Sequence, residues 1–206
     1  KFVIFQTFMM EKSNLKPNEV LQKYWGYSSF RFPQQDIIES ILAGKDTLAL
    51  LPTGGGKSIC FQIPALILEG TCLVISPLIS LMKDQVQNLR KRNIKASAIV
   101  SGMRENEIET VLENCKAGKI KILYVSPERL QSEIFKERLL HVKISFIAVD
   151  EAHCISQWGY DFRPPYLKIA DFRTLYHNLP VMALTATATP EVVIDIQEKL
   201  QFKKPN

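Results

Sequence analysis

The chain has 206 residues, of which 46% are hydrophobic and 23% charged, a composition typical of a globular domain with one sizeable core. The formal net charge of +5 permits a polyanionic partner but does not require one. No apolar run reaches the length of a membrane span, so we expect no membrane partner.

We expect one domain over residues 15–200. Residues 1–14 are expected to be an extension outside it, because the apolar stretch 1–10 is too short for a signal peptide and no small-residue cleavage site follows. Residues 201–206 are expected to begin a linker, because Lys-Lys-Pro-Asn extends a helix poorly.

Within the domain, short runs rich in Val, Ile and Leu alternate with helix-length segments. The predicted strands are 46–50, 71–76, 95–100, 120–126, 144–150 and 181–185. The predicted helices are 33–43, 57–69, 78–93, 103–117, 127–141, 165–177 and 190–200, with Ser126 and Thr189 as hydroxyl caps before a proline. This alternation predicts an α/β fold with a doubly wound, mainly parallel sheet, which binds ligands beyond the carboxyl ends of its strands.

The four cysteines are far apart in the sequence and form no C-x-x-C pair: Cys60, Cys72, Cys115 and Cys154. We therefore expect buried, reduced thiols instead of a zinc site or a disulfide framework. Reduced thiols favour a reducing compartment, either the cytoplasm, where the nucleoid lies, or the nucleus.

A glycine-rich segment, Leu-Pro-Thr-Gly-Gly-Gly-Lys-Ser, follows the first predicted strand and precedes a helix. Its backbone N–H groups and the helix N-terminus suit a phosphate, Lys57 can reach the β- and γ-phosphates, and the Ser58 hydroxyl can bind Mg²⁺. The predicted phosphate-binding residues are Thr53, Gly54, Gly55, Gly56, Lys57 and Ser58. The strict phosphate-loop pattern has glycine where this chain has Leu51, and the alternative is a glycine turn before an ordinary helix.

An acidic pair, Asp150 and Glu151, ends the fifth predicted strand. Asp150 suits a Mg²⁺ ligand, through a water molecule, and Glu151 can orient or deprotonate an attacking water. His153 could sense the γ-phosphate. With Lys57 these three residues form the predicted catalytic set. The alternatives are a solvated loop and a structural histidine.

Six sequence blocks resemble the RecQ family of superfamily 2 DNA helicases, in the order and at the spacing typical of that family. An upstream block at 30–34 also resembles the family. The blocks are 51–66, 76–85, 124–130, 150–153, 154–164 and 183–189. The resemblance covers about residues 15–200. It implies the first of two RecA-like motor domains, with helices on both faces of the sheet, that uses ATP and Mg²⁺. It also implies 3′-to-5′ DNA unwinding coupled to ATP hydrolysis. The implied partners are single-stranded and forked DNA and a second RecA-like domain of the same protein. We therefore expect little turnover from this chain alone.

The resemblance also implies how the base of ATP would be bound. Gln34 would read the adenine edge, because an amide both donates and accepts hydrogen bonds. Tyr27 and Arg31 would sandwich the base between a ring face and a planar guanidinium. The alternative for Tyr27 and Arg31 is a contact between helices.

For DNA, the resemblance points to an aromatic-rich loop at 154–164. Trp158, Tyr160 and Phe162 would stack on unpaired bases, and Arg163 would contact the backbone. Members of the family commonly carry His at the position of Tyr160, a change that keeps stacking but can lose an imidazole hydrogen bond. Such a run of aromatic residues is otherwise mostly core.

Two further blocks of the resemblance would contact phosphates through the hydroxyls of Ser80 and Ser126, which taken alone are ordinary helix caps. The block around Thr185 and Thr187 would link hydrolysis to DNA movement, and its alternative is a strand end followed by a cap.

Two other functions fit part of the pattern. A small-molecule kinase would share the phosphate loop, but it needs an acceptor pocket, and an aromatic loop follows the acidic pair instead. A non-catalytic DNA-binding module would not need Lys57, Asp150 and Glu151, all of which are present.

Overall fold

The computed structural model describes residues 15–159 and 161–203. Residues 1–14, Tyr160 and residues 204–206 lie outside the described part, and so do the predictions made for them. The described part forms one sheet of six parallel strands in the order β1-β6-β5-β2-β4-β3. The α/β fold with a parallel sheet is therefore confirmed.

All six predicted strands are present; β6 has the predicted bounds, and each of the others is shortened by one or two residues at one or both ends. They are β1 (Thr47–Leu50), β2 (Thr71–Ile75), β3 (Ala96–Ile99), β4 (Ile122–Val125), β5 (Ile144–Val149) and β6 (Val181–Thr185). The α-helices are α2 (Pro17–Trp25), α3 (Gln34–Leu42), α4 (Lys57–Ile67), α5 (Ile79–Lys91), α6 (Glu105–Lys116), α7 (Glu133–Leu139), α8 (Leu167–Leu175) and α9 (Pro190–Lys199).

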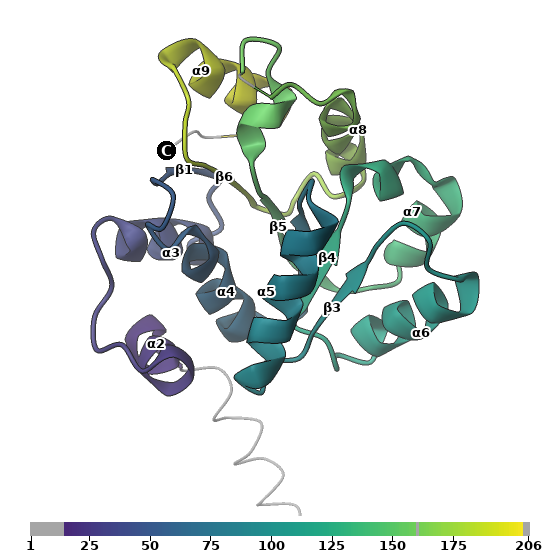
Figure 1. The fold of residues 1–206 in the computed structure, drawn as a ribbon, viewed down its shortest axis with the longest axis horizontal. Coiled ribbons are helices and arrows are strands. Elements are labelled where there is room, and N and C mark those ends of the chain that lie inside the picture. The colour runs from purple at the N-terminus through teal and green to yellow at the C-terminus, as the bar shows by residue number, and fades with distance from the viewer. Residues whose placement is uncertain (1–14, 160, 204–206) are drawn as a thin grey trace, which may run out of the picture.

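The sheet is covered on both faces (Figure 1). Apolar residues of α3, α4 and α5 pack against one face, and those of α6, α7, α8 and α9 pack against the other. Along β2, Cys72 and Val74 point into the first layer, while Leu73 and Ile75 point into the second. Because both faces are buried, the strands are apolar at most positions, and this made them recognisable in the sequence.

Two predicted helices begin differently from expectation. The segment 127–141 is a 3₁₀ turn (Pro127–Gln131) followed by α7, and Ser126 makes no side-chain cap. Ser132 is the cap instead, since its Oγ accepts a hydrogen bond from the Phe135 N–H at 3.3 Å and starts a new helix. The segment predicted from residue 165 also begins as a 3₁₀ turn, Pro164–Tyr166, before α8.

The predicted cap at Thr189 is confirmed. Its Oγ1 accepts a hydrogen bond from the Val192 N–H at 3.4 Å, and Pro190 occupies the first position of α9. A proline suits that position because its missing N–H would have no partner within the helix.

A buried ion pair at the amino end of β1 was not foreseen. The side chains of Asp46 and Arg173 are each 3% exposed, and the Arg173 Nη2 donates to Asp46 Oδ2 at 2.6 Å. Asp46 also accepts hydrogen bonds from the N–H groups of Val181 at 2.8 Å and Lys203 at 2.7 Å, and Arg173 donates to the Leu200 carbonyl. This cluster therefore ties β1, β6, α8 and the chain after α9 together.

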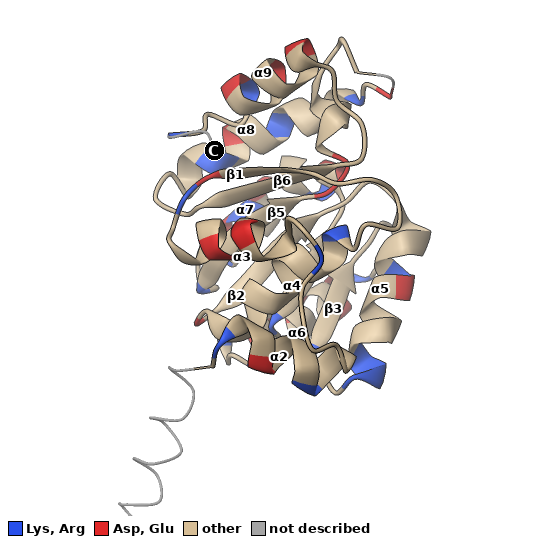
Figure 2. Cartoon of the chain, turned by 90° about the vertical axis from the view of Figure 1, so that its left-hand side faces the viewer, with Lys and Arg blue, Asp and Glu red and all other residues tan. Residues whose placement is uncertain are grey.

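All four cysteines are buried and unpaired, as predicted. No helix in the described part is both long and apolar enough to cross a membrane. In the view of Figure 2, Lys, Arg, Asp and Glu residues are distributed over several helices.

Candidate active site

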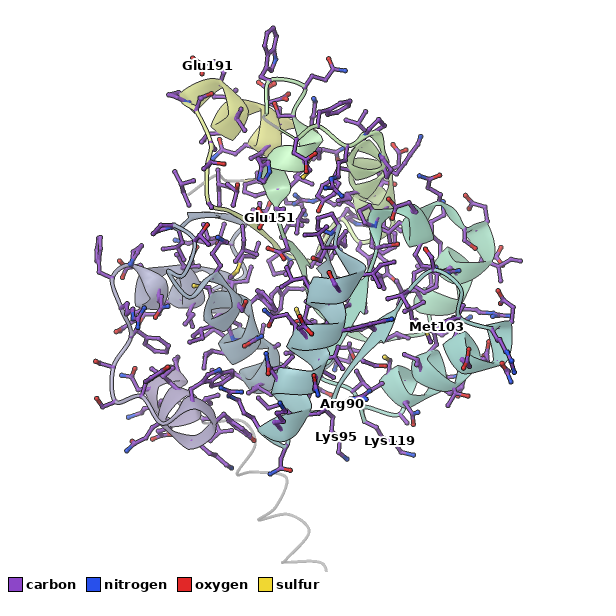
Figure 3. The ribbon with its side chains drawn as sticks, viewed as in Figure 1. Arg90, Lys95, Met103, Lys119, Glu151 and Glu191 are labelled. Carbon is purple, nitrogen blue, oxygen red and sulfur yellow. The ribbon has the colours of Figure 1, made fainter. Side chains whose placement is uncertain are left out.

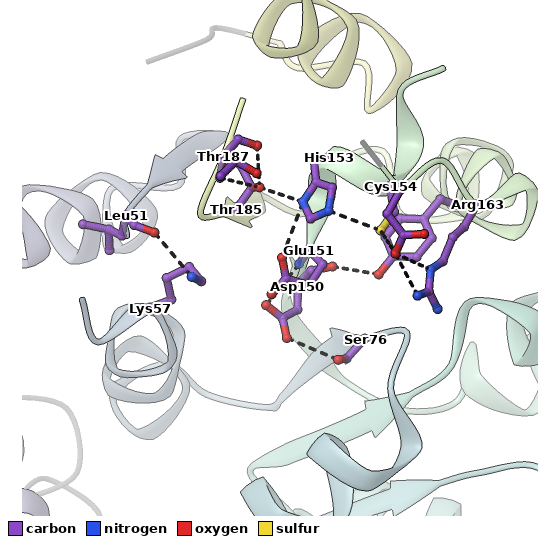
Figure 4. A network of polar contacts seen from close by, with 12 residues as sticks. Leu51, Lys57, Ser76, Asp150, Glu151, His153, Cys154, Arg163, Thr185 and Thr187 are labelled. Atoms are coloured by element: carbon purple, nitrogen blue, oxygen red, sulfur yellow. Dashed lines mark hydrogen bonds and ion pairs between the residues drawn. The ribbon is translucent and has the colours of Figure 1, made fainter. Parts of the chain in front are cut away.

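The predicted chemistry lies at one edge of the sheet. Strands β1, β6, β5 and β2 are consecutive neighbours in the sheet. At their carboxyl ends lie Leu51 after β1, Thr185 as the last residue of β6, Asp150 after β5 and Ser76 after β2. The Leu51 N–H donates to the Thr185 carbonyl at 3.1 Å, and the Asp150 N–H donates to the Ile75 carbonyl at 2.9 Å. The fold therefore brings the glycine-rich loop and the acidic pair together (Figure 4).

The glycine-rich loop turns through left-handed backbone conformations at Gly54 (φ 77°) and Gly56 (φ 78°), which only glycine adopts readily. A Cβ on Gly56 would lie 2.3 Å from Nε2 of Gln34, so space as well as conformation requires glycine there. Lys57 begins α4, and its Nζ donates to the Leu51 carbonyl at 3.3 Å, which holds the ammonium over the loop.

Gln34 lies against this loop. Its side chain is 3% exposed, its Oε1 accepts from the Arg31 N–H at 3.0 Å, and its Nε2 donates to the carbonyls of Gly55 at 3.1 Å and Gly56 at 3.4 Å. One lone pair on Oε1 remains for a base, so adenine recognition by Gln34 stays a prediction. Tyr27 is 53% exposed and Arg31 is also at the surface, and their sandwich stays a prediction too.

Asp150 is a mostly buried carboxyl. Burial, together with the nearby charge of Glu151, raises the pKa of Asp150 to about 6. A hydrogen bond from Ser76 Oγ at 3.2 Å, another from the Glu151 N–H at 3.1 Å, and the charge of Lys57 each act to lower that pKa. Because the charges of Lys57 and Asp150 influence each other, the glycine-rich loop and the acidic pair face the same space.

Glu151 has a left-handed backbone (φ 49°, ψ 46°), an unfavourable conformation for a residue with a side chain. The Cys154 N–H donates to its carbonyl at 2.9 Å, which closes a short turn and holds this conformation. In Figure 3, Glu151 lies near the centre of the view, in the segment that directly follows β5. This unfavourable backbone conformation lies directly after Asp150, within the acidic pair.

His153 contacts Glu151 and Thr185. Its Nδ1 lies 2.8 Å from Thr185 Oγ1 and 3.4 Å from Glu151 Oε2. Thr185 Oγ1 also lies 3.0 Å from the Thr187 carbonyl, so its single proton serves either that carbonyl or His153 Nδ1. His153 therefore links the acidic pair to the end of β6.

The site residues fit a hard divalent cation. Ser58 and Asp150 supply oxygen atoms, and within the described residues Asp150 has no ion pair to balance its buried charge. No group of three or more His, Cys, Asp or Glu side chains in that part could hold a metal alone. Mg²⁺ suits such a site because it usually keeps several waters and phosphate oxygens as ligands.

The loop predicted to contact DNA leaves Trp158 78% exposed and Phe162 half-buried. Arg163 is held by Asp161, whose Oδ2 accepts from Nε at 3.0 Å and from Nη2 at 2.8 Å; this bond raises the pKa of Arg163. A Cβ on Gly159 would lie 2.5 Å from the His153 carbonyl oxygen, so glycine is required for the loop to fold back there.

The two predicted phosphate contacts differ in exposure. Ser80 is exposed in the first turn of α5, whereas Ser126 is 4% exposed at the end of β4. A phosphate can therefore reach the Ser80 hydroxyl more directly than that of Ser126.

Two site contacts were missed in the sequence. The Tyr166 hydroxyl, fully buried, donates to the Asp150 carbonyl at 2.8 Å, and Ser76 holds the Asp150 carboxylate. Ser76 follows a strand, which is a usable signal, but its pairing with Asp150 depends on β2 and β5 being neighbours. Nothing in the local sequence marks Tyr166.

The sequence matches the DEAD/DEAH box helicases over residues 31–196. The chain belongs to that family. The helicase domain is 50% identical over 189 residues to the probable ATP-dependent DNA helicase RecS of Bacillus subtilis, covering 91% of this chain and 38% of that protein. It is 47% identical to the ATP-dependent DNA helicase RecQ of Pasteurella multocida, covering 91% of this chain and 30% of that protein. The helicase domain thus spans between a quarter and two fifths of these relatives.

Solved structures share the fold of the helicase domain. The DUF1998 helicase MrfA matches with a TM-score of 0.72 at 18% identity, over 92% of this chain and 31% of that chain. The Hef helicase domain of Pyrococcus furiosus matches with a TM-score of 0.65 at 21% identity, over 85% of this chain and 37% of that chain. These likenesses confirm the doubly wound fold expected from the sequence.

Proposed function

We propose that this chain is the ATP-binding motor domain of an ATP-dependent DNA helicase that unwinds DNA in the 3′-to-5′ direction. The observation that carries the proposal is the convergence of the glycine-rich loop and the Asp150–Glu151 pair on one sheet edge, where the charge of Lys57 acts on Asp150. The similarity to RecS and RecQ, both named as ATP-dependent DNA helicases, supports DNA as the substrate.

The reaction is hydrolysis of ATP to ADP and phosphate. Lys57 binds the β- and γ-phosphate oxygens and stabilises the charge that develops on them. Glu151 orients the attacking water and accepts its proton. Ser58 and Asp150 would hold Mg²⁺, which supplies charge neutralisation at the phosphates. Gln34 binds the adenine edge, between Tyr27 and Arg31, and His153 reports on the γ-phosphate.

The whole protein would bind single-stranded and forked DNA, with Trp158, Tyr160 and Phe162 stacking on bases and Arg163, Ser80 and Ser126 on the backbone. Breaking the Asp161–Arg163 pair would free the guanidinium for DNA. A second RecA-like domain would supply an arginine to the phosphates, which is worth on the order of 10³–10⁵ in rate. We therefore propose little turnover from this chain alone, and a cytoplasmic or nuclear location.

The test is DNA-stimulated ATP hydrolysis by the intact protein. Lys57→Ala should abolish it, while Lys45→Ala, which removes an exposed lysine before β1, should leave it unchanged. Replacing single-stranded DNA with small phosphate acceptors separates a helicase from a kinase. Full activity of Lys57→Ala, or stimulation by a small acceptor and not by DNA, would overturn the proposal.

A further inference from the structure

A chain of three polar side chains links the glycine-rich loop to helix α5. The Gln62 Nε2 donates to Gln85 Oε1 at 3.0 Å, and the Gln85 Nε2 donates to Ser58 Oγ at 3.2 Å. Gln62 is 4% exposed, while Gln85 and Ser58 are half-buried. Gln62 and Ser58 belong to α4 and Gln85 to α5, so a neighbouring helix holds the hydroxyl that is expected to bind the cation.

The order of donors and acceptors along these three side chains decides which group of Gln85 faces the Ser58 hydroxyl. A primary amide has an accepting oxygen on one side and a donating NH₂ group on the other. Because Gln62 donates to the oxygen of Gln85, the NH₂ group of Gln85 is left facing Ser58. The buried Gln62 therefore selects the orientation of Gln85.

A serine hydroxyl has one proton and two lone pairs, and it rotates freely without a partner. The Gln85 N–H occupies one lone pair from the α5 side. The second lone pair is then the one available to a cation.

We propose that Gln85 is a positioning residue, oriented by Gln62, that turns the Ser58 hydroxyl so that a lone pair faces the divalent cation. This inference rests on the proposed function, because it needs a nucleotide-bound cation at Ser58.

The connection between β2 and α5 contacts the other candidate ligand as well. Ser76, directly after β2, donates its Oγ proton to Asp150 Oδ2 at 3.2 Å. Residues 76–85 therefore hold both oxygen donors of the cation, Ser58 through Gln85 and Asp150 through Ser76. Outer partners that orient metal ligands in this way contribute to metal affinity without touching the metal.

The expected effect of losing Gln85 is moderate. Gln85 and Ser58 border a cavity of about 260 Å³ that is also lined by Asn88 and Arg92, so a water molecule can partly replace the missing amide. We expect the gain in nucleotide affinity that Mg²⁺ provides to fall about threefold to tenfold, the range of one hydrogen bond.

The experiment measures binding of a fluorescent ADP analogue to the intact protein, with saturating Mg²⁺ and with EDTA. The ratio of the two affinities is the Mg²⁺-dependent gain. Gln85→Leu should lower this gain and leave the affinity in EDTA unchanged, and Gln62→Leu should lower it less. Gln87→Leu, an exposed glutamine of the same helix, is the matched control and should change nothing.

A cycle with Ser58→Ala separates positioning from a general structural role. In the Ser58→Ala background, Gln85→Leu should have no further effect, because the hydroxyl it orients is gone. The inference would be overturned if Gln85→Leu kept the full Mg²⁺-dependent gain in affinity, or if it weakened binding equally with and without Mg²⁺. It would also be overturned if Gln85→Leu still lowered the gain in the Ser58→Ala background. If Gln85→Leu fails to fold, Gln62→Leu decides. Absence of any nucleotide binding by the unaltered protein would instead refute the proposed function.

Discussion

Replacing Asp150 with Asn should stabilise the protein at neutral pH while it removes a proposed ligand of the cation. Burial and the charge of Glu151 raise the pKa of Asp150 from 3.8 to about 6. The folded state therefore binds a proton more tightly than the unfolded state, and its stability falls as the pH rises from about 4 through 6. About 2 pKa units at 1.36 kcal/mol each correspond to ~3 kcal/mol. Partial exposure of the carboxyl and the hydrogen bond lost from the Glu151 N–H reduce this to ~2 kcal/mol.

The assay is denaturant unfolding of the unaltered protein and Asp150→Asn between pH 5 and pH 8 without nucleotide. The difference in unfolding free energy between the two proteins isolates the contribution of Asp150 from that of the other titrating groups. As the pH rises, the variant should become more stable relative to the unaltered protein. At pH 7.5 the melting temperature should rise by about 4–8 °C. Asp84→Asn, which alters an exposed aspartate of α5, is the control and should show no such pH-dependent difference.

The reasoning fails if Asp150→Asn is less stable than the unaltered protein at pH 7.5, or if the difference between them does not depend on pH. The same variant should lose the Mg²⁺-dependent part of nucleotide binding. A variant that gains stability while losing the ligand would show that the site is maintained at the expense of the fold.

Three other changes test separate parts of the structure. Arg173→Met leaves Asp46 buried without its charge partner and should lower the unfolding free energy by about 3–5 kcal/mol in denaturant titrations. Gly159→Ala places a Cβ 2.5 Å from the His153 carbonyl oxygen and should cost about 1–3 kcal/mol by the same measurement. Gln34→Ala removes the contacts to Gly55 and Gly56 and should weaken binding of adenine nucleotides; equal affinity for ATP before and after the change would contradict the assigned role.

The strands and the phosphate loop were predictable because each has a local signature. A strand buried on both faces is apolar at most positions, and a glycine-rich turn before Lys57 and a helix has a clear physical use. The break in the segment 127–141 was not predictable from its apolar pattern. It depends on Ser132 competing as a cap, and a serine inside a helical pattern carries no mark of that choice.

The unforeseen contacts share a different cause. Asp46 and Arg173, and likewise Ser76 and Asp150, are far apart in the sequence and meet only because of the strand order. A sequence shows that each residue is polar, but it does not show that the two will be neighbours. The partner of a buried polar group was therefore the least predictable feature, even where the group itself was identified correctly.

The carboxyl ends and the amino ends of the strands affect the stability of the fold in opposite directions. At the carboxyl edge, an ionised Asp150 without a cation and the left-handed backbone of Glu151 both lower stability. At the amino edge of β1, Asp46 receives three hydrogen bonds that join the strand starts to the chain after α9, and that cluster keeps the fold together. Because the destabilising groups and this cluster lie at opposite ends of the strands, the proposed nucleotide and cation would relieve the strain at the carboxyl ends without disturbing the amino ends. The domain can therefore hold an unfavourable arrangement of charges ready for a ligand while it stays folded.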